Sequence, residues 1–355
     1  MPYRVIQWST GNVGKLALRA IINHPELELV GLWVSSDAKA GRDAGEIAGL
    51  APVGVRATTD AEALLAQDAD CVCYTATADL RPAEAIEDIC RILRAGKNVV
   101  SSSFVPLVYP PAAPADMVEQ LEQACRDGNT SCYTSGIDPG FANDALPLLL
   151  MSACERVDSV RVMEIVNYDT YDQPTVLFET MGFAKPLDHT PLLLIPGVLT
   201  LAWGSVVKIL AAGLGVEVEE IREIYEKIPT ERAFDIRPGH VPAGTMAALR
   251  FEVQGLVGGR PRIVLEHVTR LRDDLAPDWP QPVGDSRGCY RVVVEGSPRF
   301  VCDLAFEGED GDHNTGGLVA TALRLLNAIP AVCAARPGLL SPLDLPLYTA
   351  RGLMV

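Results

Sequence analysis

A short turn near the start of the sequence has the residue types of a phosphate-binding loop. Ser9-Thr10-Gly11-Asn12-Val13-Gly14 follows an apolar run and opens an amphipathic one, and it matches the pattern G-x-G-x-x-G with serine in place of the first glycine. Glycine at 11 allows the main chain to approach a pyrophosphate, and glycine at 14 allows the next helix to pack closely on the strand. Free N–H groups at the helix N-terminus would then bind the phosphates. The turn therefore predicts a dinucleotide site.

Gly14-Lys15 also resembles the end of a P-loop, the phosphate-binding turn of many ATPases. Two residues argue against that class. Ser9 stands where the P-loop pattern needs glycine, and Leu16 stands where it needs the serine or threonine that binds Mg²⁺. We therefore set the ATPase interpretation aside.

The choice between NAD and NADP is made at the end of the second strand of such a fold. A carboxylate there binds the ribose 2′-hydroxyl of NAD, whereas hydroxyl and cationic groups suit the 2′-phosphate of NADP. Ser35 and Ser36 end the expected strand, and Lys39 and Arg42 follow, so we expect NADP(H) to be preferred. Asp37 favours NAD(H), which remains the alternative cofactor, and the two cations could instead be solvated turn residues.

Small polar residues follow other strands as well. Ligands of a doubly wound sheet bind at the carboxyl ends of its strands, so these residues would contact the ribose and the nicotinamide, or would instead cap the following helices. The further expected cofactor-binding residues are Thr75, Ala76, Thr77, Ser102 and Ser103, together with Gly140 and Phe141 at the end of a turn-rich segment.

Hydride transfer at a dinucleotide site also needs a group that polarises or protonates the reacting substrate. Our candidates are Glu164, Tyr168 and His313. Glu164 is either an inward-facing carboxylate or a solvated strand residue, and Tyr168 is either catalytic or a packing residue. His313 opens the last helix, where it either contacts the substrate or caps the helix. His267 shares an apolar face with Leu265, which favours a core histidine over a ligand.

Composition restricts the partners. The chain has 46 acidic and 30 basic residues, giving a formal charge of −16, which repels nucleic acid and anionic membrane surfaces. A small-molecule substrate fits better. The nine cysteines are odd in number and lack zinc-ribbon spacing, as expected for reduced thiols in the cytoplasm. No hydrolase or metalloenzyme motif is present, and we expect no metal.

The uncharged run 191–207 is the one segment that suggests a membrane span. Pro196 and Gly197 interrupt it, and a spanning helix needs about 20 apolar residues, so we expect a buried or subunit-interface helix. The acidic stretch 217–226 that follows is predicted to be helical. The uncharged run and the second sheet provide more apolar surface than one substrate domain would leave exposed, which predicts a homodimer through the second domain.

Elements that could position these groups follow from hydrophobic periodicity. Short apolar strands alternate with amphipathic helices over residues 1–140, which predicts an α/β fold with an N-terminal Rossmann domain built on a doubly wound parallel sheet. Residues 141–314 should form a second α+β domain, for substrate and dimerisation, on a mostly antiparallel sheet of about five strands. We expect the C-terminal segment 315–355 to pack back on the first domain.

The sequence resembles one family. Ser9–Gly14, Gly45-Glu46, the segment Ser135-Gly-Ile-Asp-Pro-Gly-Phe141 and Leu265-Glu-His-Val-Thr-Arg270 are similar to the dihydrodipicolinate reductase-like proteins, which include 2,4-diaminopentanoate dehydrogenase and the native amine dehydrogenases. The resemblance covers nearly the whole chain. It implies an NAD(P)H-linked reductase or dehydrogenase that acts at a C=N or C=O carbon of a small ketone, imine or amine, in a cleft between the two domains of a homodimer.

The sequence departs from that family at one informative place. Amine-forming members carry a glutamate just before a Tyr-Pro pair; here Tyr109-Pro110 is present, but 104–108 contains no carboxylate. The His-His-Lys signature of true dihydrodipicolinate reductases is also missing. The alternative function is therefore a non-catalytic dinucleotide-binding redox sensor that retains the cofactor site without proton-transfer chemistry.

Overall fold

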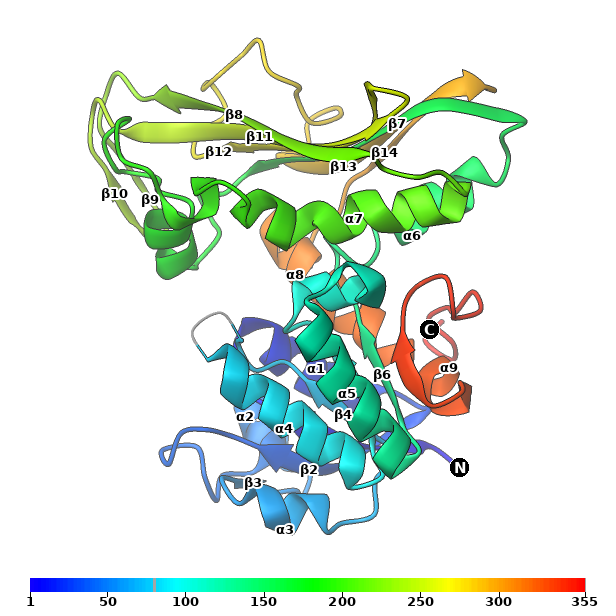
Figure 1. Ribbon diagram of the computed structural model, residues 1–355. Coiled ribbons are helices and arrows are strands. Elements are labelled where there is room, and N and C mark those ends of the chain that lie inside the picture. The colour runs from blue at the N-terminus through cyan, green and yellow to red at the C-terminus, as the bar shows by residue number, and fades with distance from the viewer. Residues whose placement is uncertain (79–80, 355) are drawn as a thin grey trace. The chain divides into compact units, whose positions relative to one another are not determined.

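The computed structural model describes residues 1–78 and 81–354 of the chain. They form two compact units, Met1–Gly140 with Leu318–Val355 and Phe141–Gly317, which we call the first and second unit (Figure 1). The first is built on a parallel sheet and the second on a mixed, largely antiparallel one. This confirms the predicted α/β fold class, a Rossmann doubly wound sheet followed by an α+β part.

The sheet of the first unit has seven strands in the order β15-β6-β5-β4-β1-β2-β3, and neighbouring strands are parallel. Side chains alternate between two cores. Ile6 and Trp8 of β1 lie in one apolar cluster, whereas Val5 lies in the other. Both faces are therefore buried, which is why these strands are continuous apolar runs. The strands are β1 (Tyr3–Trp8), β2 (Leu27–Trp33), β3 (Ala57–Thr58), β4 (Cys71–Tyr74), β5 (Asn98–Ser101), β6 (Ser131–Thr134) and β15 (Gly338–Leu340).

Helices cover both faces of this sheet. α4 (Pro82–Arg94) and α5 (Ala115–Gly128) bury Ile89 and Leu121 in the cluster of Ile6, and α1 (Asn12–Asn23) buries Ile21 in the cluster of Val5. The end of α8 (His313–Leu326) and α9 (Ile329–Ala334) share the core of α1. Of two short helices, α2 (Ala44–Ala48) lies between β2 and β3 in the chain, and α3 (Ala61–Leu65) lies between β3 and β4.

The second unit carries a six-stranded sheet in the order β14-β13-β7-β12-β11-β8. Its central pair, β7 and β12, is parallel, and the other neighbours are antiparallel. Figure 1 shows α7 (Val198–Leu214) along one face of this sheet, where Trp203 packs on Phe251 at 5.0 Å between ring centroids. The strands are β7 (Arg156–Asn167), β8 (Glu220–Pro229), β11 (Met246–Val257), β12 (Arg260–Arg270), β13 (Gly288–Ser297) and β14 (Phe300–Leu304), with the separate pair β9 (Phe234–Ile236) and β10 (Gly239–Val241) and the short helix α6 (Ala145–Met151).

One expectation for this unit was wrong. The acidic stretch 217–226, predicted as helix, largely forms edge strand β8, because Ile221 turns inward between exposed charges and β11 offers the backbone partner. The uncharged run 191–207 contains a helix, as expected: Pro196 and Gly197 separate a short 3₁₀ turn at Leu192–Leu194 from α7, which buries Leu199 and Val206.

One helical stretch among the described residues, His313–Ala334, is long and apolar enough to cross a membrane by length and composition alone. Ala322, Leu325 and Ile329 within it are fully buried in the core of the first unit. A core helix passes the same test of length and composition, and these contacts account for its apolar face.

Candidate functional site

The glycine-pattern turn joins β1 to α1 in the first unit. Ser9, which replaces the first glycine, has φ +80°, a left-handed conformation that favours glycine. Its backbone N–H donates to the Trp33 carbonyl of β2 at 3.0 Å. The serine therefore adopts the tight turn that the pattern assigns to glycine, and α1 begins three residues later at Asn12.

The two glycines of this turn have different surroundings. At Gly11, an added Cβ would meet nothing within 4 Å, and φ is −70°. At Gly14, it would lie 2.5 Å from the Ser9 carbonyl oxygen and 2.6 Å from Thr75 Oγ1. Gly14 thus holds α1 against the strand ends, while Gly11 leaves open space in front of the helix N-terminus. These residues fit a dinucleotide pyrophosphate.

Gln7, which we did not predict, holds the glycine-pattern turn in place through side-chain hydrogen bonds. It is fully buried in β1, and its Nε2 donates to the Ser9 carbonyl and to Thr75 Oγ1, both at 2.9 Å. Thr75 in turn donates to the Trp8 carbonyl at 3.0 Å. The feature of the sequence that could have identified Gln7 is a polar residue inside an otherwise apolar strand.

Lys39 reaches the same turn from the loop after β2. Its Nζ donates to Thr10 Oγ1 at 2.9 Å, whereas Ser35 and Ser36 are exposed and Asp37 is exposed beside them. The structure thus brings the predicted cation together with the predicted turn. The serines lie past the end of β2 rather than inside it.

The remaining predicted cofactor residues lie in three places. Thr75, Ala76 and Thr77 follow β4, and Ser103 Oγ donates to the Ala76 carbonyl at 2.6 Å, which joins them to Ser102-Ser103 after β5. Gly140 has φ +126° and no room for a side chain, because a Cβ would lie 2.1 Å from the Gly136 nitrogen. Gly140 and Phe141 stand where the first unit ends and the second begins.

The second unit contains a buried carboxylate cluster. Glu164 of β7 is 6% exposed, and its two carboxylate oxygens accept hydrogen bonds from Tyr290 at 2.9 Å and from Tyr168 at 3.2 Å. His267 Nδ1 lies 3.0 Å from the same carboxylate. Sheet register causes this meeting, since His267 of β12 and Tyr290 of β13 are the direct cross-strand partners of Glu164.

Electrostatics keep Glu164 ionised. Burial alone would raise its pKa, but the opposing effects of His267 and the hydrogen bonds from His267, Tyr290 and Tyr168 together lower the pKa below its ordinary value. A buried carboxylate that is charged at neutral pH and bonded to three side chains is a candidate proton acceptor.

His267 is enclosed by aromatic rings, as the core-histidine interpretation expects. Its ring stacks on Phe251 at 4.7 Å and lies 4.6 Å from Trp203 of α7, and the residue is 3% exposed. It nevertheless reaches Glu164, so it is both a packed residue and a partner of the candidate acid–base group. Tyr290 was not predicted at all, because no local pattern links it to a residue 126 positions earlier.

His313 lies at the start of α8, beside the end of β7. Its Nε2 is 2.7 Å from the Asn167 carbonyl oxygen, which can only accept, so the ring proton is on Nε2. Burial lowers the pKa of His313, which keeps the ring neutral near pH 7. Asn314 Nδ2 also donates to Asn167, at 3.1 Å. No hydrogen bond joins His313 to Glu164 among the described residues.

Comparison with known proteins identifies the family. Residues 141–354 match the 2,4-diaminopentanoate dehydrogenase C-terminal domain, and residues 5–101 match the N-terminus of dihydrodipicolinate reductase. An amine dehydrogenase of Streptomyces virginiae is 43% identical over 98% of this chain and 97% of its own. A 2,4-diaminopentanoate dehydrogenase of Acetoanaerobium sticklandii is 24% identical over 75% of this chain and 71% of its own.

A solved amine dehydrogenase structure, from Mycobacterium smegmatis, superposes with a TM-score of 0.78 and covers 98% of this chain and 97% of the other at 19% identity, which shows a shared fold. The two matched domain families together span most of the chain. This chain therefore belongs to the dihydrodipicolinate reductase-like family of NAD(P)-dependent oxidoreductases, which includes 2,4-diaminopentanoate dehydrogenase and amine dehydrogenase.

Proposed function

We propose that this chain is an NAD(P)H-dependent reductase or dehydrogenase that moves a hydride to or from the C=O or C=N carbon of a small ketone, imine or amine. The observation that carries the proposal is the buried Glu164 carboxylate, bonded to Tyr290, Tyr168 and His267 in a chain that also contains a dinucleotide turn. The cluster places two phenol hydroxyls and an imidazole on one buried carboxylate, an arrangement that can accept and relay a proton.

The first unit would hold the dinucleotide. The N–H groups at the start of α1 would bind the pyrophosphate in the open space at Gly11, and Thr75 and Ser103 would lie along the ribose and nicotinamide. When bound, the nicotinamide accepts or supplies the hydride.

The second unit would handle the proton. When an amine is oxidised, its carbon loses a hydride and its nitrogen loses a proton, so an acceptor of fixed geometry is needed. We assign Tyr168 to contact the substrate and pass the proton to Glu164, with Tyr290 and His267 holding the carboxylate. We also assign His313, whose ring proton is on Nε2, to contact the substrate.

Cofactor preference follows from the loop after β2. Lys39 is held at the turn by Thr10, and Ser35 and Ser36 are exposed nearby, so a 2′-phosphate would meet a cation and hydroxyls. We propose NADP(H) as the preferred cofactor, NAD(H) as the alternative, and a cytoplasmic homodimer as the working form.

A substrate panel tests the proposal. Small ketones with ammonium, small amines and small aldehydes would be scored by the change in NADPH absorbance, with wild type and Glu164→Gln side by side. We expect turnover of at least one member, and a loss of kcat of about a hundredfold or more in the variant with unchanged NADPH affinity. Absence of turnover across the panel, with NADPH binding intact, would favour the redox-sensor alternative.

A further inference from the structure

A pocket of about 210 Å³ lies in the second unit, at the ends of β7 and β12 and beside the loop that follows β12. Arg270 is the last residue of β12 and one of the residues that line this pocket. It stands three positions after His267, whose ring contacts Trp203 of α7, and the side chains of a strand alternate between its two faces. Arg270 therefore lies on the other face of the sheet from His267 and Glu164, and the pocket is separate from the buried carboxylate cluster.

Arg270 places a buried cation at this pocket. The residue is only 3% exposed, and its guanidinium has five N–H donors. Nε donates to the Leu275 carbonyl at 2.9 Å. Nη2 donates to the carbonyls of Ala276 and Pro280, at 3.1 Å and 2.9 Å. These bonds use the N–H of Nε and both N–H groups of Nη2, so the two unused donors are both on Nη1.

The unused side of the guanidinium is accessible. Nη1 makes no hydrogen bond to the described residues, and it is not closed off from solvent as the unpartnered buried atoms of the chain are. Nε and Nη2 share one edge of the planar group, and their carbonyl partners belong to the segment 275–280, whose residues do not line the pocket. Nη1 is on the opposite edge, so it is the part of the Arg270 guanidinium that opens to the pocket.

The charge of Arg270 is not balanced by a carboxylate. Asp273 acts on it only through its charge, because the Asp273 oxygens accept hydrogen bonds from Asn167 and Arg287. Burial lowers the pKa of Arg270, as expected for a cation that is held by neutral carbonyl oxygens. A buried cation without a counterion among the described residues is unfavourable, and an anion bound in the pocket would compensate it.

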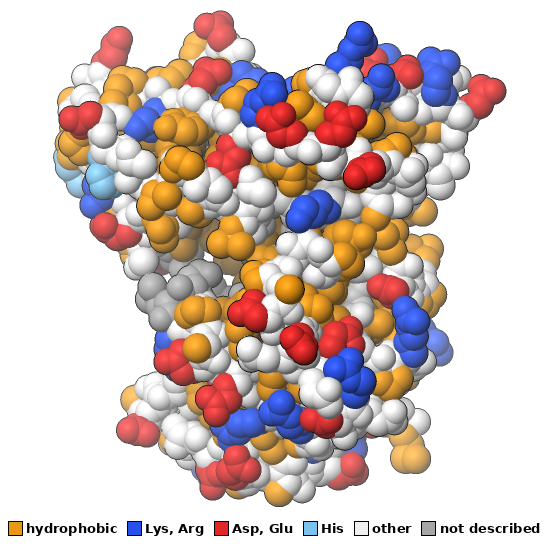
Figure 2. Space-filling model, in the orientation of Figure 1, with side chains coloured by type: hydrophobic (Ala, Val, Ile, Leu, Met, Phe, Trp, Pro, Cys, Tyr) orange, Lys and Arg blue, Asp and Glu red, His pale blue; other side chains and the backbone are white. Residues whose placement is uncertain are grey.

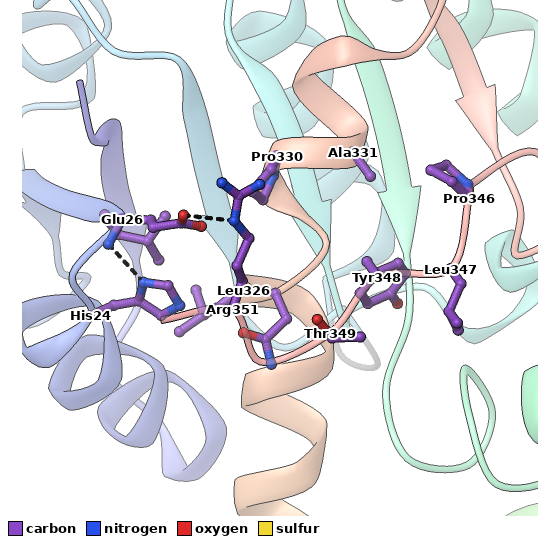
Figure 3. Close-up of a pocket in the computed structure, with 12 residues that line it drawn as sticks. His24, Glu26, Leu326, Pro330, Ala331, Pro346, Leu347, Tyr348, Thr349 and Arg351 are labelled. Atoms are coloured by element: carbon purple, nitrogen blue, oxygen red, sulfur yellow. Dashed lines mark hydrogen bonds and ion pairs between the residues drawn. The ribbon is translucent and has the colours of Figure 1, made fainter. Parts of the chain in front are cut away.

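The larger cavity of the first unit, which Figure 3 shows, provides a contrast. It has a volume of about 320 Å³ and is lined by residues of the C-terminal tail and of the segment after α1. Its Arg351 is exposed and paired, with 3.0 Å between Nε and Glu26 Oε1, as a dashed line in Figure 3 marks. That cation already has a counterion, whereas Arg270 is buried and has none in the described part of the chain. The smaller pocket is therefore the one that offers an uncompensated charge to a ligand.

We propose that the pocket at Arg270 binds a small monocarboxylate with a short apolar tail. A carboxylate oxygen would accept hydrogen bonds from Arg270 Nη1, and the tail would lie against Val166 and Pro282. The volume is below that of most drug-sized sites, which restricts the ligand to a small acid. Asp273 and Asp285 also line the pocket, and their charges disfavour a ligand with a second negative charge.

The probe for the test is 3,3,3-trifluoropropionate, whose binding is followed by ¹⁹F NMR relaxation. Its uncharged counterpart, 3,3,3-trifluoropropionamide, has the same tail and is the comparison at equal ionic strength. We expect the carboxylate to bind saturably with a Kd of about 5 mM or tighter and the amide at least tenfold more weakly. Arg270→Met should abolish the binding of the carboxylate. Arg260→Met, which removes the same charge from the exposed beginning of β12, should leave it unchanged.

Asp285→Asn provides a test that does not depend on the loss of a buried group. Asp285 is exposed and lines the pocket, so its replacement removes a repulsive charge without disturbing the core. We expect this variant to bind the carboxylate about twofold more tightly. Asp278→Asn removes the same charge from an exposed position of the same loop that does not line the pocket, and it should bind as the wild type does.

Three results would overturn the proposal. Unchanged ¹⁹F relaxation of the carboxylate at about 10 mM would mean that the pocket holds only water. Equal binding of the amide and the carboxylate by the wild type would exclude the charge of Arg270 as the basis of recognition. Equal affinity of Asp285→Asn and Asp278→Asn for the carboxylate would place the bound anion elsewhere on the molecule. The first two results use the wild type alone, so they hold whether or not Arg270→Met folds.

Discussion

Gly11 and Gly14 stand three positions apart and should respond oppositely to an added side chain. Gly11 has φ −70° and open space at its Cβ position, so Gly11→Val should fold normally. The new side chain would occupy the space proposed for the pyrophosphate. We expect dinucleotide affinity to fall by at least tenfold, about 1.4 kcal/mol, while the melting temperature of the cofactor-free protein shifts by only a few degrees.

Gly14→Ala is the matched comparison. Its Cβ would press on the Ser9 carbonyl oxygen, a backbone atom that cannot move without displacing the turn. The melting temperature should fall further than in Gly11→Val. Calorimetric titration and thermal unfolding of both variants check the pair. Normal affinity in a destabilised Gly11→Val protein would show that Gly11 is only a structural turn residue.

Because of Glu164, the stability of the folded protein should decrease at acidic pH. In the folded protein the pKa of Glu164 is lowered from the ordinary 4.5. The ionised carboxylate therefore contributes fully to stability above the pKa that Glu164 has in the unfolded chain. This contribution is lost as the pH falls through the pKa that Glu164 has in the folded protein. Glu164→Gln cannot titrate. We therefore expect the melting temperature of the wild type, measured relative to this variant, to decrease from about pH 5 downward. A difference independent of pH over that window would show that Glu164 has the same pKa in the folded and unfolded chain.

At the scale of elements, local pattern was enough for the first sheet and not for the second. Continuous apolar strands followed by helices predicted β1, α1 and β2 in order, because each lies on a sheet buried on both faces. Strand β8 was mistaken for helix, since an edge strand exposes most of its residues and its pairing with β11 is not visible locally. The parallel pairing of β7 with β12 was missed for the same reason.

The loop after β2 carries the prediction on cofactor preference. Lys39 Nζ is fixed on Thr10, at 2.9 Å from its hydroxyl, where a 2′-phosphate would gain a charge partner and a 2′-hydroxyl would not. Lys39→Met should weaken the binding of NADPH by about tenfold and change the affinity for NADH little, as measured by titration calorimetry. Lys208→Met on α7 removes the same charge in the second unit and should change neither constant. If the wild type binds NADH as tightly as NADPH, Asp37 becomes the ribose ligand.

At the scale of the whole molecule, the sequence indicated the groups of the candidate site better than their contacts. Glu164, Tyr168 and His313 were selected by residue type and position. The contacts of Glu164 with His267 and Tyr290 depend on which strands become neighbours in the second sheet.

Net charge is also a property of the whole molecule. On the face that Figure 2 shows, acidic and basic side chains are interspersed, so the acidic residues of this face are not gathered at one site.

Assembly is the last property that the whole chain decides. Leu192, Ile195 and Leu201, in and before α7, have exposed fractions of 57%, 43% and 57%, and no charge interrupts the chain from 191 to 207. Exposed apolar groups in such a cluster are typical of a subunit interface. We therefore expect sedimentation velocity at micromolar concentration to give twice the 38.1-kDa chain mass.

Leu201→Glu would place a charge in that interface and should give a monomer, because a buried unpaired carboxylate is costly. Leu343→Glu, at a 47% exposed leucine of the first unit, should remain dimeric. If the wild type is a monomer, the exposed leucines belong to the surface of a single chain. If Leu201→Glu remains a dimer, the interface lies on another face of the second unit.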